Sequence, residues 1–218
     1  MRLTRSNFFL PLLTLVISCV AANVQAQPAA NVGSYVFALS WSPGFCDVEG
    51  DREHRLECQR GSHLGFVTHG LWANDNNGQE IICDGGDDLS DRGKNRASAV
   101  FSDTGLANHE WKTHWSCLGV SEDDFLDAVT KARALVSIPN SLAAPSAAQS
   151  LDPEDIRGSF ASTNSTVLQR QQVTVTCVNR ELTQVKFCVK SDLSGFRNCD
   201  GKDRRSCPAA QVDQEPPR

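Results

Sequence analysis

Basic residues are scarce in this sequence, where 21 Lys and Arg stand against 26 Asp and Glu and give a net charge of −5 at pH 7. A protein with this balance does not bind polyanions through its overall charge at neutral pH, so such a ligand would have to be held locally. After the N-terminal segment, no apolar run is long enough to span a bilayer. The 218 residues, 40% of them hydrophobic, exclude low-complexity disorder and fit one domain with a sizeable core.

The first 26 residues have the pattern of a secretory signal peptide. Two arginines precede an apolar run over residues 8–22, and Val24-Gln25-Ala26 has the small residues typical of a cleavage site. A lipoprotein signal with Cys19 lipidated is the alternative, and it also exports the protein. We therefore expect a mature chain of residues 27–218, periplasmic or secreted, that is not held in a membrane. Loss of the two arginines brings its net charge to −7.

The cysteines indicate disulfides rather than a zinc site. No two of them have the Cys-x-x-Cys spacing of zinc ligands, and eight remain after the signal segment, which predicts four disulfides in an exported chain. In a predicted hairpin over residues 173–190, Cys177 falls on the apolar face and Cys188 on the polar face, so these two should not bond to each other. Nested bridges are then the simplest choice for the C-terminal region. The expected pairs are Cys46–Cys58, Cys83–Cys117, Cys177–Cys207 and Cys188–Cys199.

Hydrophobic periodicity predicts helices and strands in separate stretches of the chain. Strands are expected over residues 35–41 and 64–68 and in the 173–190 hairpin. Helices are expected over residues 108–117, over 121–136 with Ser121 as N-cap, and over 153–160. Residues 84–98 are predicted to be a solvated loop, and the tail from about residue 211 to be disordered. This order favours an α+β fold, an antiparallel sheet with packed helices, rather than alternating βαβ units.

All five histidines lie between residues 54 and 114, which predicts acid–base chemistry in that region, although His54 and His63 match no motif and are expected at the surface. His109 and His114 are five residues apart, about 140° around a helix, so they cannot share a zinc as His-Glu-x-x-His does. Glu110 and His114 are four apart and share a helix face. This pairing suits proton transfer, and no metal is expected.

Two short segments resemble the motifs of the ribonuclease T2 family, the metal-independent acid ribonucleases with little base preference. The matching segments are Thr68-His69-Gly70-Leu71-Trp72 and residues 109–117, with similar stretches at 39–46 and 173–199. Either motif alone is weak, but two in order, with the cysteine framework and an export signal, are strong. The resemblance spans most of residues 35–207. It implies a monomeric enzyme that cleaves single-stranded RNA, not DNA, without a cofactor.

The same resemblance implies a role for each residue that matches. His114 would be the general base that takes the proton of the ribose 2′-hydroxyl, and His69 the general acid that protonates the departing 5′-oxygen. His109 would bind the phosphate, and Glu110 would help to hold the phosphorane-like transition state. Trp72 would stack on a base, although packing in the core is an equal alternative for it. The product would be a 2′,3′-cyclic phosphate that water later opens.

The sequence departs from the family pattern at three positions in these motifs. Thr113 stands where the family has a lysine, Trp115 where it has a glycine, and Ala73 where it has a proline. Lys112 is one position early, about 100° around the helix, so Thr113 and Lys112 are both candidate phosphate contacts. The departures weaken the expected charge stabilisation, not the acid–base pair. Two alternatives are therefore a catalytically impaired relative that binds RNA or another partner, and an extracellular binding module without chemistry.

Overall fold

The computed structural model describes residues 32–49, 56–201 and 206–218, so the predicted signal segment and His54 lie outside the described residues. A six-stranded sheet has the order β2-β1-β5-β6-β3, with β4 paired to β5. The strands are β1 Ser34–Trp41, β2 Phe66–Asn74, β3 Gln149–Leu151, β4 Val173–Val178, β5 Glu181–Lys190 and β6 Val212–Gln214. All neighbours pair antiparallel except β5 and β6, which confirms an α+β fold built on a mainly antiparallel sheet.

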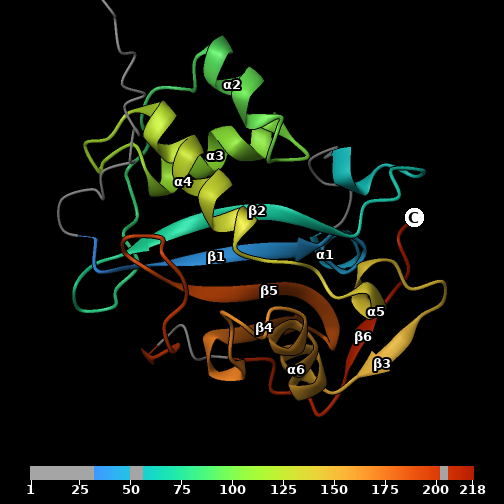
Figure 1. Ribbon diagram of the computed structural model, residues 1–218. Helices are drawn as coiled ribbons and strands as arrows, with labels where there is room; N and C mark the ends of the chain where they lie inside the picture. Colours follow the sequence, from blue (N-terminus) through green and yellow to red (C-terminus); the bar gives the residue numbers. More distant parts are fainter. Residues whose placement is uncertain (1–31, 50–55, 202–205) are drawn as a thin grey trace, which may run out of the picture.

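The helices gather at the two sides of this sheet (Figure 1). Two of them, α3 and α4, pack at the β2 side, and α6 packs against β4. The helices are α1 Ser42–Glu49, α2 Asp91–Ala97, α3 Thr104–His114, α4 Glu122–Ala134, α5 Asn140–Ala143 and α6 Pro153–Thr163, with short 3₁₀ turns η2 Leu56–Cys58 and η3 Arg170–Gln172. No helix in the described ranges is long and apolar enough to cross a membrane.

Strand β1 is the centre of the core. All eight of its residues are buried, and Tyr35 stacks on Trp115 with ring centroids 5.5 Å apart while Phe37 stacks on Phe187 at 6.2 Å. At the start of α4, Ser121 and Asp124 form a capping box, which confirms the predicted N-cap. These contacts fix α3 and α4 over one end of the sheet.

The predicted solvated loop over residues 84–98 is wrong in its second half, where α2 forms. Ser90 caps this helix by accepting a hydrogen bond from the Gly93 amide. Arg92 and Arg96 form ion pairs with acidic residues of α4, and Asp123 receives both guanidinium groups. The charged side chains of this segment, which suggested a loop, therefore pair with a neighbouring helix. Local sequence does not reveal this pairing.

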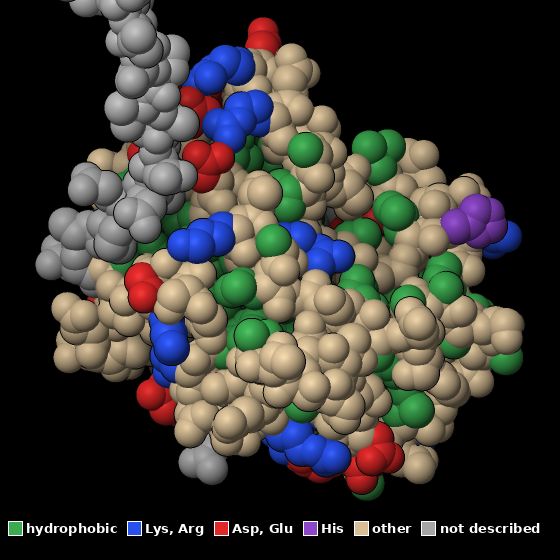
Figure 2. Space-filling model, viewed as in Figure 1, with side chains coloured by type: hydrophobic (Ala, Val, Ile, Leu, Met, Phe, Trp, Pro, Cys, Tyr) green, Lys and Arg blue, Asp and Glu red, His purple; other side chains and the backbone are tan. Residues whose placement is uncertain are grey.

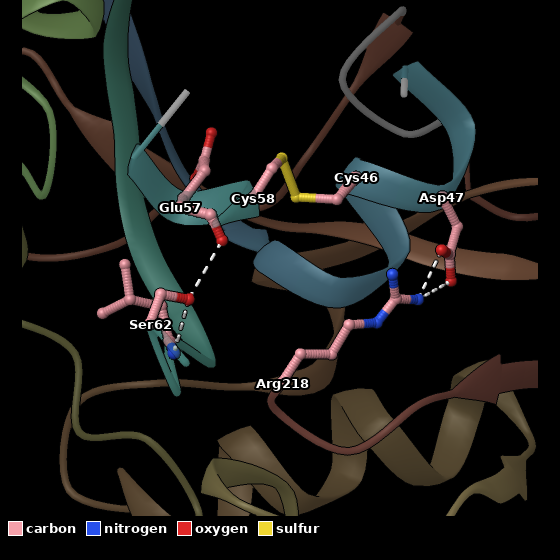
Figure 3. The surroundings of a disulfide bond; sticks show 7 residues. Cys46, Asp47, Glu57, Cys58, Ser62 and Arg218 are labelled. Atoms are coloured by element: carbon pink, nitrogen blue, oxygen red, sulfur yellow. Dashed lines mark hydrogen bonds and ion pairs between the residues drawn. A yellow bond between two sulfur atoms is a disulfide. The ribbon is translucent and has the colours of Figure 1, made fainter. Parts of the chain in front are cut away.

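The predicted disorder of the tail is also wrong. Strand β6 pairs with β3, and its Val212 and Gln214 are fully buried. Beyond it, the Glu215 carbonyl accepts a hydrogen bond of 3.1 Å from Trp41 Nε1. Figure 3 shows the end of the tail beside a disulfide, where the Arg218 guanidinium binds the Asp47 carboxylate of α1. The tail is polar in sequence, but tertiary contacts order it.

All four predicted disulfides are present: Cys46–Cys58, Cys83–Cys117, Cys177–Cys207 and Cys188–Cys199. Part of the reasoning for the last two is corrected, because Cys188 is fully buried rather than on a polar face. The register of the hairpin places Cys177 opposite Leu182, which keeps it away from Cys188. The hairpin turn is a tight one, since only Asn179 and Arg180 separate the strands, both with positive φ.

Candidate active site

A β-bulge in β2 redirects the side chain of His69. Ala38 of β1 lies opposite Gly70, whereas the next residue, Leu39, lies opposite Thr68, so His69 is the extra residue in the ladder. In a regular strand, successive side chains point to opposite faces of the sheet. A bulge interrupts this alternation and can turn a side chain to the same face as its neighbour. The bulge thereby places His69 on the sheet face that Gly70 shares.

Two polar side chains of the neighbouring strands hold the His69 ring. Ser40 Oγ of β1 lies 2.7 Å from Nδ1, and Gln184 Nε2 of β5 lies 3.3 Å from the same nitrogen. Ser40 and Gln184 are paired across β1 and β5, so one row of the sheet supplies both contacts. The other ring nitrogen, Nε2, lies 3.5 Å from Glu110 Oε1. Sequence reasoning missed Ser40 and Gln184, because only the strand register brings them to the histidine.

Helix α3 supplies a buried carboxylate to the same place. Glu110 is 1% exposed, and its Oε2 accepts a hydrogen bond of 2.8 Å from Trp72 Nε1. A Cβ atom at Gly70 would fall 2.0 Å from that oxygen, so the glycine of the first motif makes room for the carboxylate. His114 follows one turn after Glu110 and places Nε2 3.9 Å from Oε2. The structure therefore brings His69, Glu110 and His114 together, with the carboxylate between the two imidazoles.

Burial changes the acid–base behaviour of His114. Burial, followed by the nearby charge of His109, lowers the pKa of His114 to about 4, and a backbone hydrogen bond at Ile81 opposes this shift. The imidazole is therefore neutral above about pH 4 and can accept a proton. On the other side of the ring, Glu80 Oε1 lies 3.3 Å from Nδ1. Glu80 was not predicted, because it reaches His114 only after the chain turns back beside Asn74 at the end of β2.

Trp72 stands between the two histidines. Its ring centroid lies 5.5 Å from that of His69 and 5.8 Å from that of His114, and Lys186 Nζ lies 4.7 Å over the ring. Because Lys186 covers part of the ring and the indole N–H is bound to Glu110, the contacts support a positioning role for Trp72. Trp111, by contrast, packs on Phe125 in the core, with ring centroids 5.7 Å apart.

The structure does not bring Lys112 into the site. Its Nζ lies 2.9 Å from Asp88 Oδ1, and this contact lowers the pKa of the Asp88 carboxyl. The helical angle predicts this direction, and the ion pair with Asp88 gives no support to Lys112 as a phosphate contact. Thr113 lies on α3 one turn after the exposed His109, and its carbonyl accepts a hydrogen bond of 2.7 Å from the Cys83 amide.

The surface of the molecule carries charges of both signs. On the face that Figure 2 shows, Lys and Arg side chains lie interspersed with Asp and Glu side chains. Among the described residues, no group of three or more His, Cys, Asp or Glu side chains is arranged to hold a metal ion. The site is therefore a local arrangement of imidazoles, one buried carboxylate and one ammonium group.

Solved structures of similar fold include a plant ribonuclease and an RNase-related plant protein. An RNase-related protein from Calystegia sepium superimposes with a TM-score of 0.66 at 18% identity, over 85% of this chain and 98% of that chain. Ribonuclease MC1 from bitter gourd seeds has a TM-score of 0.59 at 18% identity, over 82% and 98% of the two chains. These likenesses establish the fold.

Sequence comparison adds the family. A ribonuclease of Aeromonas hydrophila is 31% identical over 137 residues, 62% of this chain and 61% of that protein. A probable ribonuclease of Haemophilus influenzae is 30% identical over 126 residues, 51% of this chain and 46% of that protein. The match thus spans about half to three fifths of the length of these curated relatives. Residues 32–199 match the Ribonuclease T2 family, which covers most of the chain and both motifs. This chain therefore belongs to the ribonuclease T2 family.

Proposed function

We propose that this protein is an endoribonuclease that cleaves single-stranded RNA by transphosphorylation, with low base specificity and without a metal. The observation that carries the proposal is the buried Glu110 carboxylate between the imidazoles of His69 and His114. A binding module has no need of two imidazoles around one carboxylate, whereas proton transfer requires groups that gain and lose protons at fixed positions. Family membership, and relatives named as ribonucleases, support the same activity.

RNA carries its own nucleophile, so the chain has to supply only a base, an acid and charge stabilisation. In the proposed reaction neutral His114 takes the proton of the 2′-hydroxyl, and the 2′-oxygen attacks the adjacent phosphorus. The bond from phosphorus to the 5′-oxygen breaks, and protonated His69 gives its proton to that oxygen. The products are a 2′,3′-cyclic phosphate and a free 5′-hydroxyl. In a second step, water opens the cyclic phosphate with the two roles reversed.

The remaining residues support this transfer. Ser40 and Gln184 orient the His69 ring, and Trp72 fixes the Glu110 carboxylate by its indole N–H. Exposed His109 is the proposed phosphate contact of α3, and Glu110 stabilises the pentacoordinate transition state between the two imidazoles. A structural neighbour, a variant of ribonuclease MC1, was solved with 5′-UMP, which shows that protein's fold accommodating a nucleotide.

Four disulfides fit an oxidising compartment, so we place the mature protein in the periplasm or outside the cell. We also propose that it acts as a monomer and leaves DNA intact. The proposed reaction needs a 2′-hydroxyl, which accounts for the discrimination against DNA without any further specificity device.

A diribonucleotide and its counterpart with a 2′-deoxyribose test the proposal. The diribonucleotide should yield a cyclic phosphate in the presence of EDTA, and the deoxy compound should stay intact. Cutting of the deoxy compound, or loss of activity that added metal restores, would falsify the mechanism. Binding of both compounds without cleavage would identify a catalytically impaired relative instead.

A further inference from the structure

Lys186 brings a positive charge into the site from β5. It lies opposite Ala38 of β1, which in turn lies opposite Gly70 of β2, so the three positions form one row across the sheet. Residues directly opposite each other project to the same face. Ala38 carries only a methyl group and Gly70 no side chain. The Lys186 side chain can therefore cross β1, and its Nζ lies 4.7 Å from the centre of the Trp72 ring in β2.

The ammonium group and the Glu110 carboxylate approach this row from different elements. Glu110 enters from α3 and occupies the space that a side chain at Gly70 would need. Its Oε2 is bound to the indole N–H of the same Trp72 ring that Lys186 covers. Lys186 is half-buried, so its charge is less screened than that of an exposed lysine. A phosphate bound beside His69 and Glu110 would therefore meet this cation.

Helix α3 supplies no permanent cation at this place. Lys112 is bound to Asp88, and Thr113 has a neutral side chain. His109 carries a charge only when it is protonated. During transphosphorylation the phosphoryl oxygens gain negative charge, and a charge-assisted hydrogen bond is about twice as strong as a neutral one.

We propose that Lys186 is a substrate-binding residue that contacts the scissile phosphate and supplies the positive charge that Thr113 lacks. This proposal rests on the ribonuclease function proposed above. The cation that contacts the phosphate would then come from β5, whereas the family motif has it on α3, at the position of Thr113. The rest of the site keeps the roles already given.

The test compares Lys186→Met with Lys190→Met on a diribonucleotide, which has a single phosphate. Lys190 is the matched control because it lies on the same face of β5 and is exposed, but pairs with Ser34, four residues along the strands from the Lys186–Ala38 pair. Lys186→Met should lower kcat/KM about 10²-fold and make the slope of log kcat/KM against log salt concentration less steep, because screening then acts on one attraction fewer. Lys190→Met should change neither quantity. Lys186→Arg keeps the charge and should recover most of the activity.

The double variant Lys186→Met with Thr113→Lys is a second test of the proposal. If Lys186 serves the phosphate, a new lysine on α3 should restore more activity to this background than it adds to the unmodified protein. Kinetics of Lys186→Met within about threefold of normal would overturn the proposal. So would an equal loss in Lys186→Met and Lys186→Arg with an unchanged salt slope, which would show that the ammonium only packs on Trp72.

The Lys186 proposal can still be tested if the proposed ribonuclease function is wrong. If the unmodified protein cleaves no RNA, binding of the 2′-deoxy dinucleotide is measured in its place, with the same variants and salt series. Weaker binding and a smaller salt slope in Lys186→Met alone would keep the phosphate contact. Equal binding by the unmodified protein, Lys186→Met and Lys190→Met would refute it.

Discussion

The Glu80 carboxylate lies beside one ring nitrogen of His114, with Glu80 Oε1 3.3 Å from His114 Nδ1. The other nitrogen of that ring, Nε2, faces Glu110 at 3.9 Å. The imidazole therefore lies between an exposed carboxylate and a buried one. Nε2 is thus the nitrogen on the Glu110 side of the ring, and Glu80 is a neighbour of the proposed base that neither motif contains.

Substitution of Glu80 tests whether that neighbour orients the base. Glu80→Ala should lower kcat about tenfold, equivalent to ~1.4 kcal/mol, because the ring loses the carboxylate that lies beside its Nδ1. Glu80→Gln, which keeps a hydrogen-bonding group, should lose less. Steady-state kinetics on the diribonucleotide measure both, with Gln79→Ala as the exposed neighbour. If Glu80→Ala has normal kcat, Glu80 is only a surface residue beside the site.

The low pKa of His114 predicts how stability depends on pH. Its folded pKa of about 4 is below the unfolded value of 6.5, so the unfolded chain binds more protons between these values. This contribution to the free energy of unfolding is complete above about pH 6.5 and is lost as pH falls towards 4, by on the order of 3 kcal/mol. Denaturant titrations over pH 4–7 measure it. His114→Gln should flatten that part of the profile, and an unchanged profile in this variant would contradict the assignment.

Activity should show a bell-shaped pH profile on the acid side of neutral. The base must be neutral, which puts the acidic limb of kcat/KM near pH 4, and the second histidine must be protonated, which ends activity at higher pH. Lower pH also reduces the net negative charge that repels RNA. A rate that keeps climbing to about pH 9 is incompatible with two histidines in these roles.

Each of the two histidines should be essential for rate. His69→Ala and His114→Ala should each lower kcat at least ~10²-fold, the usual contribution of one general acid or base. His63→Ala serves as the control, since His63 is exposed and lies outside both motifs. Circular dichroism must show that each variant is folded. Near-normal turnover in either folded variant would mean that its role is assigned wrongly.

A lysine introduced at position 113 of α3 should increase the activity. Thr113→Lys should raise turnover by up to about tenfold, or ~1.4 kcal/mol, because it adds a cation where charge develops. Lys112→Ala should have little effect, since this lysine is bound to Asp88. Turnover numbers of the two variants decide the matter. An inert Thr113→Lys together with a crippled Lys112→Ala would show that Lys112 turns into the site when RNA binds.

The ordered tail should contribute to stability. Gln214 is fully buried and donates a hydrogen bond of 2.9 Å to the Leu142 carbonyl, so Gln214→Ala leaves that carbonyl unpaired and should cost about 1–3 kcal/mol. Glu215→Ala is the control, because Glu215 binds Trp41 through its backbone carbonyl. Chemical denaturation compares the two. Equal stabilities would indicate that β6 adds nothing to the folded domain.

The sequence alone determined what depends on local pattern. Spacing places Glu110 and His114 on one helix face and turns Lys112 away, because a helix advances about 100° per residue whatever surrounds it. Ser121 caps α4 for the same local reason. The even number of cysteines predicted four disulfides but not their pairing. The hairpin was a guide to two of the pairs, although Cys188 is on a more buried face than its neighbours suggested.

Only the tertiary structure decided which residues meet across the sheet. The bulge that turns His69, its contacts with Ser40 and Gln184, and the row that carries Lys186 to Trp72 all depend on strand register. Register is set by the packing of whole strands and by bulges, which no single segment of sequence encodes. The same holds for α2 and β6, whose polar residues find partners on distant elements. Local pattern thus gave the candidate acid–base residues, the family resemblance gave their proposed roles, and long-range pairing determined their neighbours.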